Sequence, residues 1–182
     1  MQFHVQSRRS SDLTTLIVAW SRQNWSTIRF CLLFSFFVGG ILLFLETSGI
    51  SKSLQNLLST KQAQLTSWFL SLIGIKTQSA HAIVFQPQGF AIQITHGCTG
   101  IKQLGFFIAG VLAYRCSIVH KLRGMVIGAI ATFFASYVRA ISLFIIGVYA
   151  RSRFDFLHDV LWEIVMILIT FLVWLFWLKR MG

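Results

Sequence analysis

Three side chains that can do chemistry occur in or beside the apolar segments of this chain: Cys98, Arg139 and His158. A cysteine thiolate is a nucleophile, an imidazole can take up and return a proton, and a guanidinium can hold negative charge. Polar groups in segments apolar enough to enter a membrane are costly, so such groups usually have a function. We therefore interpret the three as candidates for a nucleophile, its base and its charge stabiliser.

Composition predicts a membrane protein. Of 182 residues, 55% are hydrophobic and only 12% are charged, which is too apolar for a soluble domain of this length. The formal net charge is +11, from 16 Lys and Arg against 5 Asp and Glu. The basic residues bracket apolar runs rather than forming a patch, so we expect membrane lipids, and no nucleic acid, as partners.

The three cysteines, Cys31, Cys98 and Cys116, form no CxxC motif. The sequence therefore supports neither a thioredoxin-type redox motif nor a zinc site, and we expect no metal and no cofactor. Cys31 lies in the first apolar run and Cys116 in a basic loop, so only Cys98 is expected on the outer side of the membrane.

The expected fold class is an all-α membrane protein: a bundle of about four core transmembrane helices, an external amphipathic helix and a small β-hairpin before the cysteine. Residues 1–29 are expected to form a basic N-terminal interfacial segment, with a short helix that Asp12 could cap. Residues 30–182 are expected to form a single integral-membrane domain. The predicted spans are 30–45, 101–114, 125–149 and 158–178.

Two segments between the first and second spans do not fit a transmembrane helix. The run 65–75 is too short to cross and predicts an amphipathic or re-entrant helix. Residues 82–86 and 90–95 are β-type runs separated by Pro87-Gln88-Gly89, which predicts a hairpin.

The third span carries small residues at packing spacing, namely Gly124, Gly128, Ala131 and Ala135.

The basic residues predict the orientation of the spans. With four spans and the N-terminus inside, the inner segments hold nine of these residues and the outer segments five. The positive-inside rule then places both termini in the cytoplasm. Cys98, Arg139 and His158 all fall toward the opposite face. The inner residues are Arg8, Arg9, Arg22, Arg29, Arg115, Lys121, Arg123, Lys179 and Arg180, and the outer ones Lys52, Lys61, Lys76, Arg151 and Arg153.

Cys98 lies in a glycine-flanked turn that opens a helix. A helix N-terminus favours the thiolate, and the N–H groups of Thr99 and Gly100 are candidates to bind an oxyanion. An inert buried cysteine is the equally plausible alternative.

The other two residues also have structural alternatives. Arg139, about ten residues from the outer end of its span, could form an ion pair with Glu46 or Glu163 instead of holding substrate charge. His158 is expected in the first turn of the last span, with Asp155 as N-cap and Asp159 or Glu163 orienting the ring; it could also be interfacial with no role.

His96 is a rival base, because it lies two residues before Cys98.

Three segments resemble motifs of the exosortase/archaeosortase family. FAIQITHGCTGIKQL (90–104) resembles its cysteine motif, SYVRAISLFIIG (136–147) its arginine motif and FLHDVLWEIVMI (156–167) its histidine motif. Order, spacing and membrane setting agree, and the resemblance covers roughly residues 28–180. The short length and the preceding hairpin look most like the compact branch that includes exosortase H.

The resemblance implies an integral membrane cysteine protease or transpeptidase of the bacterial inner membrane, with its active site facing the periplasm or exterior. Its partners would be secreted proteins with a C-terminal sorting signal, similar to PEP-CTERM: a short recognition motif, a membrane helix and a basic tail. Cys98 would be the nucleophile, Arg139 the charge stabiliser and His158 the base. The sequence departs from the family where Ser136 replaces a frequent asparagine and His96 a usually small residue.

Two other classes remain open at the level of sequence. A non-enzymatic membrane assembly subunit that binds a client helix would keep its activity without the Cys98 thiol. A thiol-redox membrane protein would need a second external cysteine, which the predicted topology does not provide.

Overall fold

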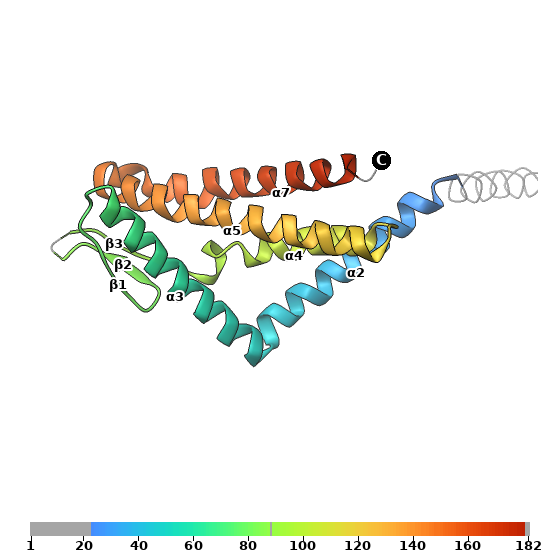
Figure 1. The fold of residues 1–182 in the computed structure, drawn as a ribbon, viewed down its shortest axis with the longest axis horizontal. Coiled ribbons are helices and arrows are strands. Elements are labelled where there is room, and N and C mark those ends of the chain that lie inside the picture. The colour runs from blue at the N-terminus through green and yellow to red at the C-terminus, as the bar shows by residue number, and fades with distance from the viewer. Residues whose placement is uncertain (1–22, 88, 181–182) are drawn as a thin grey trace, which may run out of the picture.

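The computed structural model describes residues 23–87 and 89–180. Helices dominate these residues, and a small antiparallel sheet lies at one end of the molecule (Figure 1). The predicted fold class, an all-α membrane protein with an outlying β element, is confirmed. The interfacial helix expected around Asp12 lies outside the described residues.

Three helical stretches are long and apolar enough to cross a membrane: α2 (Trp25–Thr47), α5 (Ile118–Tyr149) and the continuous stretch Arg151–Lys179, which ends in α7 (Trp162–Lys179). The second predicted span, 101–114, corresponds to α4 (Ile101–Ala113), which has only 13 residues. At 1.5 Å per residue it measures about 20 Å, less than the ~30 Å of a hydrocarbon core. In the structure α4 packs among the three longer stretches, against α2, α5 and α7 (Figure 1).

The α5 helix begins seven residues earlier than the third predicted span. His120, Lys121 and Arg123, expected in a loop, instead lie in its first turns. The Lys121 ammonium donates a 2.8 Å hydrogen bond to the carbonyl of Leu112 near the end of α4. A cation at a helix C-terminus satisfies a carbonyl that has no partner in the helix. Lys121 therefore also ties the end of α4 to α5.

The α3 helix (Gly49–Leu72) is 24 residues long, more than twice the predicted amphipathic run, and meets α2 at an angle at Ser48 (Figure 1). Its polar face is turned inward. The buried positions include Ser51, Gln55, Ser59, Thr66 and Ser67, whereas the exposed ones include Ile50, Leu54, Leu57, Leu65, Trp68 and Leu72. A polar face toward the protein and an apolar face outward suit a helix in contact with lipid.

The sheet has the order β1-β2-β3, formed by β1 (Gln78–Ala80), β2 (Ile83–Phe85) and β3 (Ala91–Gln93). Its β2–β3 pair is the predicted hairpin, with Val84 opposite Ile92. The β1 strand was not predicted, because Gln-Ser-Ala has little β-propensity. The sheet packs on α3 and α5, where Val84, Ile94, Leu70 and Phe144 form a buried cluster that includes Cys98.

The small-residue face of α5 packs inside the bundle. A Cβ atom at Gly124 would overlap the Trp177 ring of α7, and one at Gly128 would overlap the Phe107 ring of α4. These glycines therefore let the neighbouring helices come close, and side chains of α7 and α4 occupy this face of α5.

Candidate active site

Cys98 lies between the sheet and α4. After β3 the chain makes one 3₁₀ turn (His96–Cys98), in which the Cys98 N–H donates to the Thr95 carbonyl at 2.9 Å. The thiol is buried, with 6% of the residue exposed. The Thr95 hydroxyl donates to Cys98 Sγ at 3.5 Å. A hydroxyl donor beside the sulfur stabilises negative charge on it.

Gly100 makes the turn from the cysteine into α4 possible. Its φ is +77°, in the left-handed region that favours glycine. A Cβ atom at this position would lie 3.1 Å from both Ser136 Cβ and Thr132 Cγ2 of α5. Both the backbone conformation and the tight contact with α5 therefore require glycine.

We expect Gly100→Ala to lower the melting temperature of the purified protein, at a cost of about 1–2 kcal/mol from the left-handed backbone alone. Gly97→Ala is the matched control, because its Cβ would meet only Thr95 Oγ1 at an ordinary 3.8 Å. Equal melting temperatures for the two variants would contradict this account of the turn.

His158 approaches Cys98 from the last helical stretch. Its Nε2 atom lies 3.4 Å from Cys98 Sγ, and its Nδ1 atom lies 2.5 Å from Asp159 Oδ1. The Phe154 ring stacks on the imidazole, with 5.6 Å between ring centroids. An ionised carboxylate can only accept, so in the neutral imidazole Nδ1 carries the proton and Nε2 presents a lone pair to the thiol.

The helix around His158 differs from its prediction. It begins at Arg151 as a 3₁₀ turn (Arg151–Arg153), continues through α6 (Phe154–Phe156), and widens into a π-helical turn over Leu157–Leu161. Asp155 makes no capping hydrogen bond, and His158 lies well inside the helix, so its expected place in the first turn is wrong. The π turn contains both His158 and Asp159, and such bulges re-aim side chains at functional sites.

Arg139 joins the site from α5. Its Nη2 donates to the His158 carbonyl at 3.3 Å, and its Nη1 lies 3.6 Å from Glu163 Oε2. The side chain is only 5% exposed, against 49% for Glu163. Its Nε and Nη1 are buried and make no hydrogen bond within the described residues. Of the two acids considered as partners, Glu163 pairs with Arg139, whereas Glu46 pairs with Lys102 at 3.2 Å.

Ser136, one helical turn before Arg139, fixes the backbone of the nucleophile. Its hydroxyl donates to the Cys98 carbonyl at 3.2 Å. Gln62 of α3 in turn donates to Ser136 Oγ at 3.3 Å and to the Ser136 carbonyl at 2.9 Å. Sequence reasoning missed Gln62, since nothing in an amphipathic helix indicates a partner 74 residues away. Ser136 thus bonds the turn that carries Cys98 rather than the side chain of Arg139.

The structure brings His158 to Cys98 and places Arg139 against His158. The rival His96 is exposed, and within the described residues its side chain makes no hydrogen bond to the thiol. One expected oxyanion donor is not free, because the Thr99 N–H donates to the His96 carbonyl at 3.4 Å.

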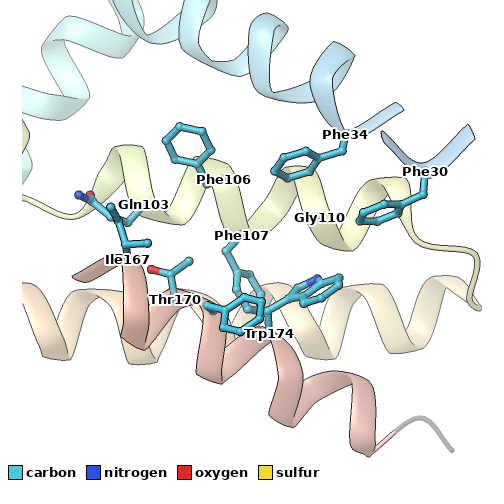
Figure 2. A pocket seen from close by; sticks show the side chains of 10 residues that line it. Phe30, Phe34, Gln103, Phe106, Phe107, Gly110, Ile167, Thr170 and Trp174 are labelled. Atoms are coloured by element: carbon cyan, nitrogen blue, oxygen red, sulfur yellow. The ribbon is translucent and has the colours of Figure 1, made fainter. Parts of the chain in front are cut away.

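Two cavities adjoin these residues. One, of about 470 Å³, lies between β3 and the helix that carries His158. The other, of about 450 Å³, is apolar and lies between α2, α4 and α7, where Phe34, Phe107 and Trp174 project into it (Figure 2). At one end of the apolar cavity, Gln103 donates to Glu163 Oε1 at 3.3 Å, which links this cavity to the Arg139 ion pair.

Comparison with known proteins gives one match. The sequence model of the transmembrane exosortases (Exosortase_EpsH) matches residues 13–180, nearly the whole chain, and includes all three candidate catalytic residues. Neither the curated proteins nor the solved structures gave a match.

Proposed function

We propose that this chain, which belongs to the transmembrane exosortase family, is a membrane cysteine protease or transpeptidase that cleaves C-terminal sorting signals of secreted proteins. The observation that carries the proposal is the 3.4 Å contact between Cys98 Sγ and His158 Nε2, with His158 Nδ1 held by Asp159. A nucleophile and base within reach, the base oriented by a third group, is the arrangement of covalent acyl-transfer enzymes.

The geometry supports a two-step reaction. The Cys98 thiol passes its proton to His158 Nε2, and the thiolate attacks the carbonyl carbon of the scissile peptide. Arg139, whose Nε and Nη1 have no hydrogen bond within the described chain, stabilises the oxyanion. As the C–N bond breaks, His158 returns the proton to the leaving amine. Water or an acceptor amine then attacks the thioester and regenerates the thiol.

The apolar, aromatic lining of the cavity in Figure 2 supports contact with part of the apolar helix of such a substrate. We place the apolar helix of the sorting signal against α2, α4 and α7. In the proposed topology both termini are cytoplasmic, the site faces the periplasm of a bacterial inner membrane, and the basic tail of the substrate stays inside.

The test is co-expression with a secreted reporter that carries a recognition segment, an apolar helix and a basic tail at its C-terminus. Wild-type protein should shorten the reporter, and the intact mass of the product separates hydrolysis from transfer to an amine. An unshortened reporter with each of a panel of family-type tails would contradict the proposal.

Arg139 gives a graded prediction within this mechanism. Arg139→Ala should lower the processing rate by about 10²–10³-fold, the usual effect of removing an oxyanion donor. Arg139→Lys should restore only part of the lost processing rate, since a lysine cannot reproduce the guanidinium's array of donors.

Glu163→Gln is the matched control, because it removes the ion pair and leaves the guanidinium in place. We expect Glu163→Gln to lower processing less than Arg139→Ala does. Glu163 is half exposed, so water already weakens its ion pair with Arg139. If Arg139→Ala lowered only the melting temperature, with processing per folded molecule unchanged, Arg139 would be a structural ion-pair residue instead.

A further inference from the structure

The β3 strand is an edge of the sheet, and its outer side is free. The Gln86 N–H donates to the Phe90 carbonyl at 3.0 Å, and the Ile94 N–H donates to the Ala82 carbonyl at 2.7 Å. Alternate residues of the segment therefore face β2, and the N–H and C=O groups of Ala91 and Gln93 point away from it. Within the described residues, these outward groups have no hydrogen-bond partner.

The free edge borders the cavity that contains the candidate base. The lining of this 470 Å³ cavity includes Phe90, Ala91, Ile92, Gln93 and Thr95 on one side, and Arg151, Phe154, Asp155 and His158 on the other. His158, which lines the cavity, also lies 3.4 Å from the sulfur of Cys98 through its Nε2 atom. The strand itself leads to the nucleophile, since Cys98 follows β3 after only four residues.

Aromatic packing fixes the strand in this position. Phe90, which precedes β3, packs on Phe144 of α5 and Phe154 of α6, with centroid distances of 5.7 and 5.5 Å. A Cβ atom at Gly147 of α5 would overlap the Phe90 ring. The outer end of the edge is therefore anchored to the same helix that carries Phe154 and His158.

Exposed strand edges are normally protected by charge, proline, a bulge or a covering element. The residues Ala91, Ile92 and Gln93 carry no charge and no proline, and β3 pairs with β2 in regular register. The opposite edge differs, because β1 packs against α3. One edge of a three-stranded sheet is thus left open beside the reactive thiol.

We infer that the substrate segment next to the scissile bond binds as an added β-strand on the free edge of β3, through its main-chain N–H and C=O groups. This inference rests on the proposed function and adds the mode of substrate recognition. Strand addition gives affinity through the backbone, and the cavity selects side chains at alternate positions. A segment that runs from the secreted domain toward the membrane lies parallel to β3, and its scissile carbonyl reaches Cys98.

The first test is photo-crosslinking in the Cys98→Ala background, which does not require cleavage. A photoreactive amino acid at position 93 should capture the co-expressed sorting-signal reporter, and peptide mapping should place the adduct in the segment before the apolar helix. As a control, the same photoreactive amino acid is placed at position 78, an exposed site on β1 at the opposite edge of the sheet. Capture at 78 equal to that at 93, or no capture at 93, would overturn strand addition.

The second test removes an edge donor. Gln93→Pro deletes the outward N–H and should lower processing about ten-fold, the effect of losing roughly one hydrogen bond at an edge that tolerates proline. Ser79→Pro, which deletes an outward N–H on β1, should leave the rate near wild type. Alkylation of Cys98 by N-ethylmaleimide at the wild-type rate shows that the site is intact.

The outcomes separate the two proposals. If wild-type protein cleaves the reporter but position 93 captures nothing and Gln93→Pro cleaves normally, strand addition is wrong and the protease proposal stands. If position 93 captures the reporter and wild-type protein never cleaves it, strand addition stands and the protease proposal fails.

Discussion

Replacing Cys98 by alanine should abolish shortening of the reporter, with a rate loss of more than ~10⁴-fold, because a covalent mechanism has no path without its nucleophile. The physical reason lies in the contacts of the sulfur. The thiol is buried between the Thr95 hydroxyl and His158 Nε2, and within the described residues no other cysteine contacts the candidate base. Cys98→Ser should also be inactive, since a hydroxyl is a far weaker nucleophile than a thiolate.

The other two cysteines provide the matched controls. Cys31 is exposed on α2 and Cys116 is half-buried between α4 and α5, and neither contacts the site. Cys31→Ala and Cys116→Ala should process the reporter at the wild-type rate. The measurement is a pulse-chase of the reporter's intact mass. Equal processing by Cys98→Ala and wild type would instead support a subunit that binds the client helix without cutting it.

The three candidate residues could be identified in the sequence because each is reactive and stands in or beside an apolar run. The way these side chains are turned toward one another could not be predicted. The 3.4 Å approach of His158 to Cys98 depends on a π turn over Leu157–Leu161. An apolar pattern read at 3.6 residues per turn does not reveal a local widening to a π turn. The same limit explains why Asp155 was expected as a helix cap: Arg151 and Ser152 resemble a loop but form the first turn.

The supporting contacts were harder still to predict. Ser136, Gln62 and the Cys98 carbonyl form a chain of hydrogen bonds across α5, α3 and the cysteine turn. Each contact joins elements far apart in sequence, and a serine or glutamine in a helix gives no sign of its partner. The inward polar face of α3 is visible in the sequence as periodicity alone. Whether that face meets water or protein depends on packing that periodicity does not encode.

His158→Ala should lower the processing rate by about 10²–10⁴-fold, the usual contribution of a positioned general base. Without the imidazole, the thiol loses the base that lies 3.4 Å from its sulfur, and the leaving amine loses its acid. Asp159→Asn should have a smaller effect, of about ten-fold. The reason is that the carboxylate fixes the ring tautomer but is 71% exposed, so water shares that role.

His96→Ala is the control that separates the two histidines. His96 is exposed, and among the described residues the histidine that reaches Cys98 Sγ is His158, so we expect the wild-type processing rate for His96→Ala. All three variants are compared with wild type in the same pulse-chase, after melting temperatures confirm that each is folded. A large loss in His96→Ala with normal processing in His158→Ala would transfer the role of base to His96. The π turn, the stacked Phe154 and the Asp159 contact all favour the opposite result, because together they hold one imidazole nitrogen toward the sulfur.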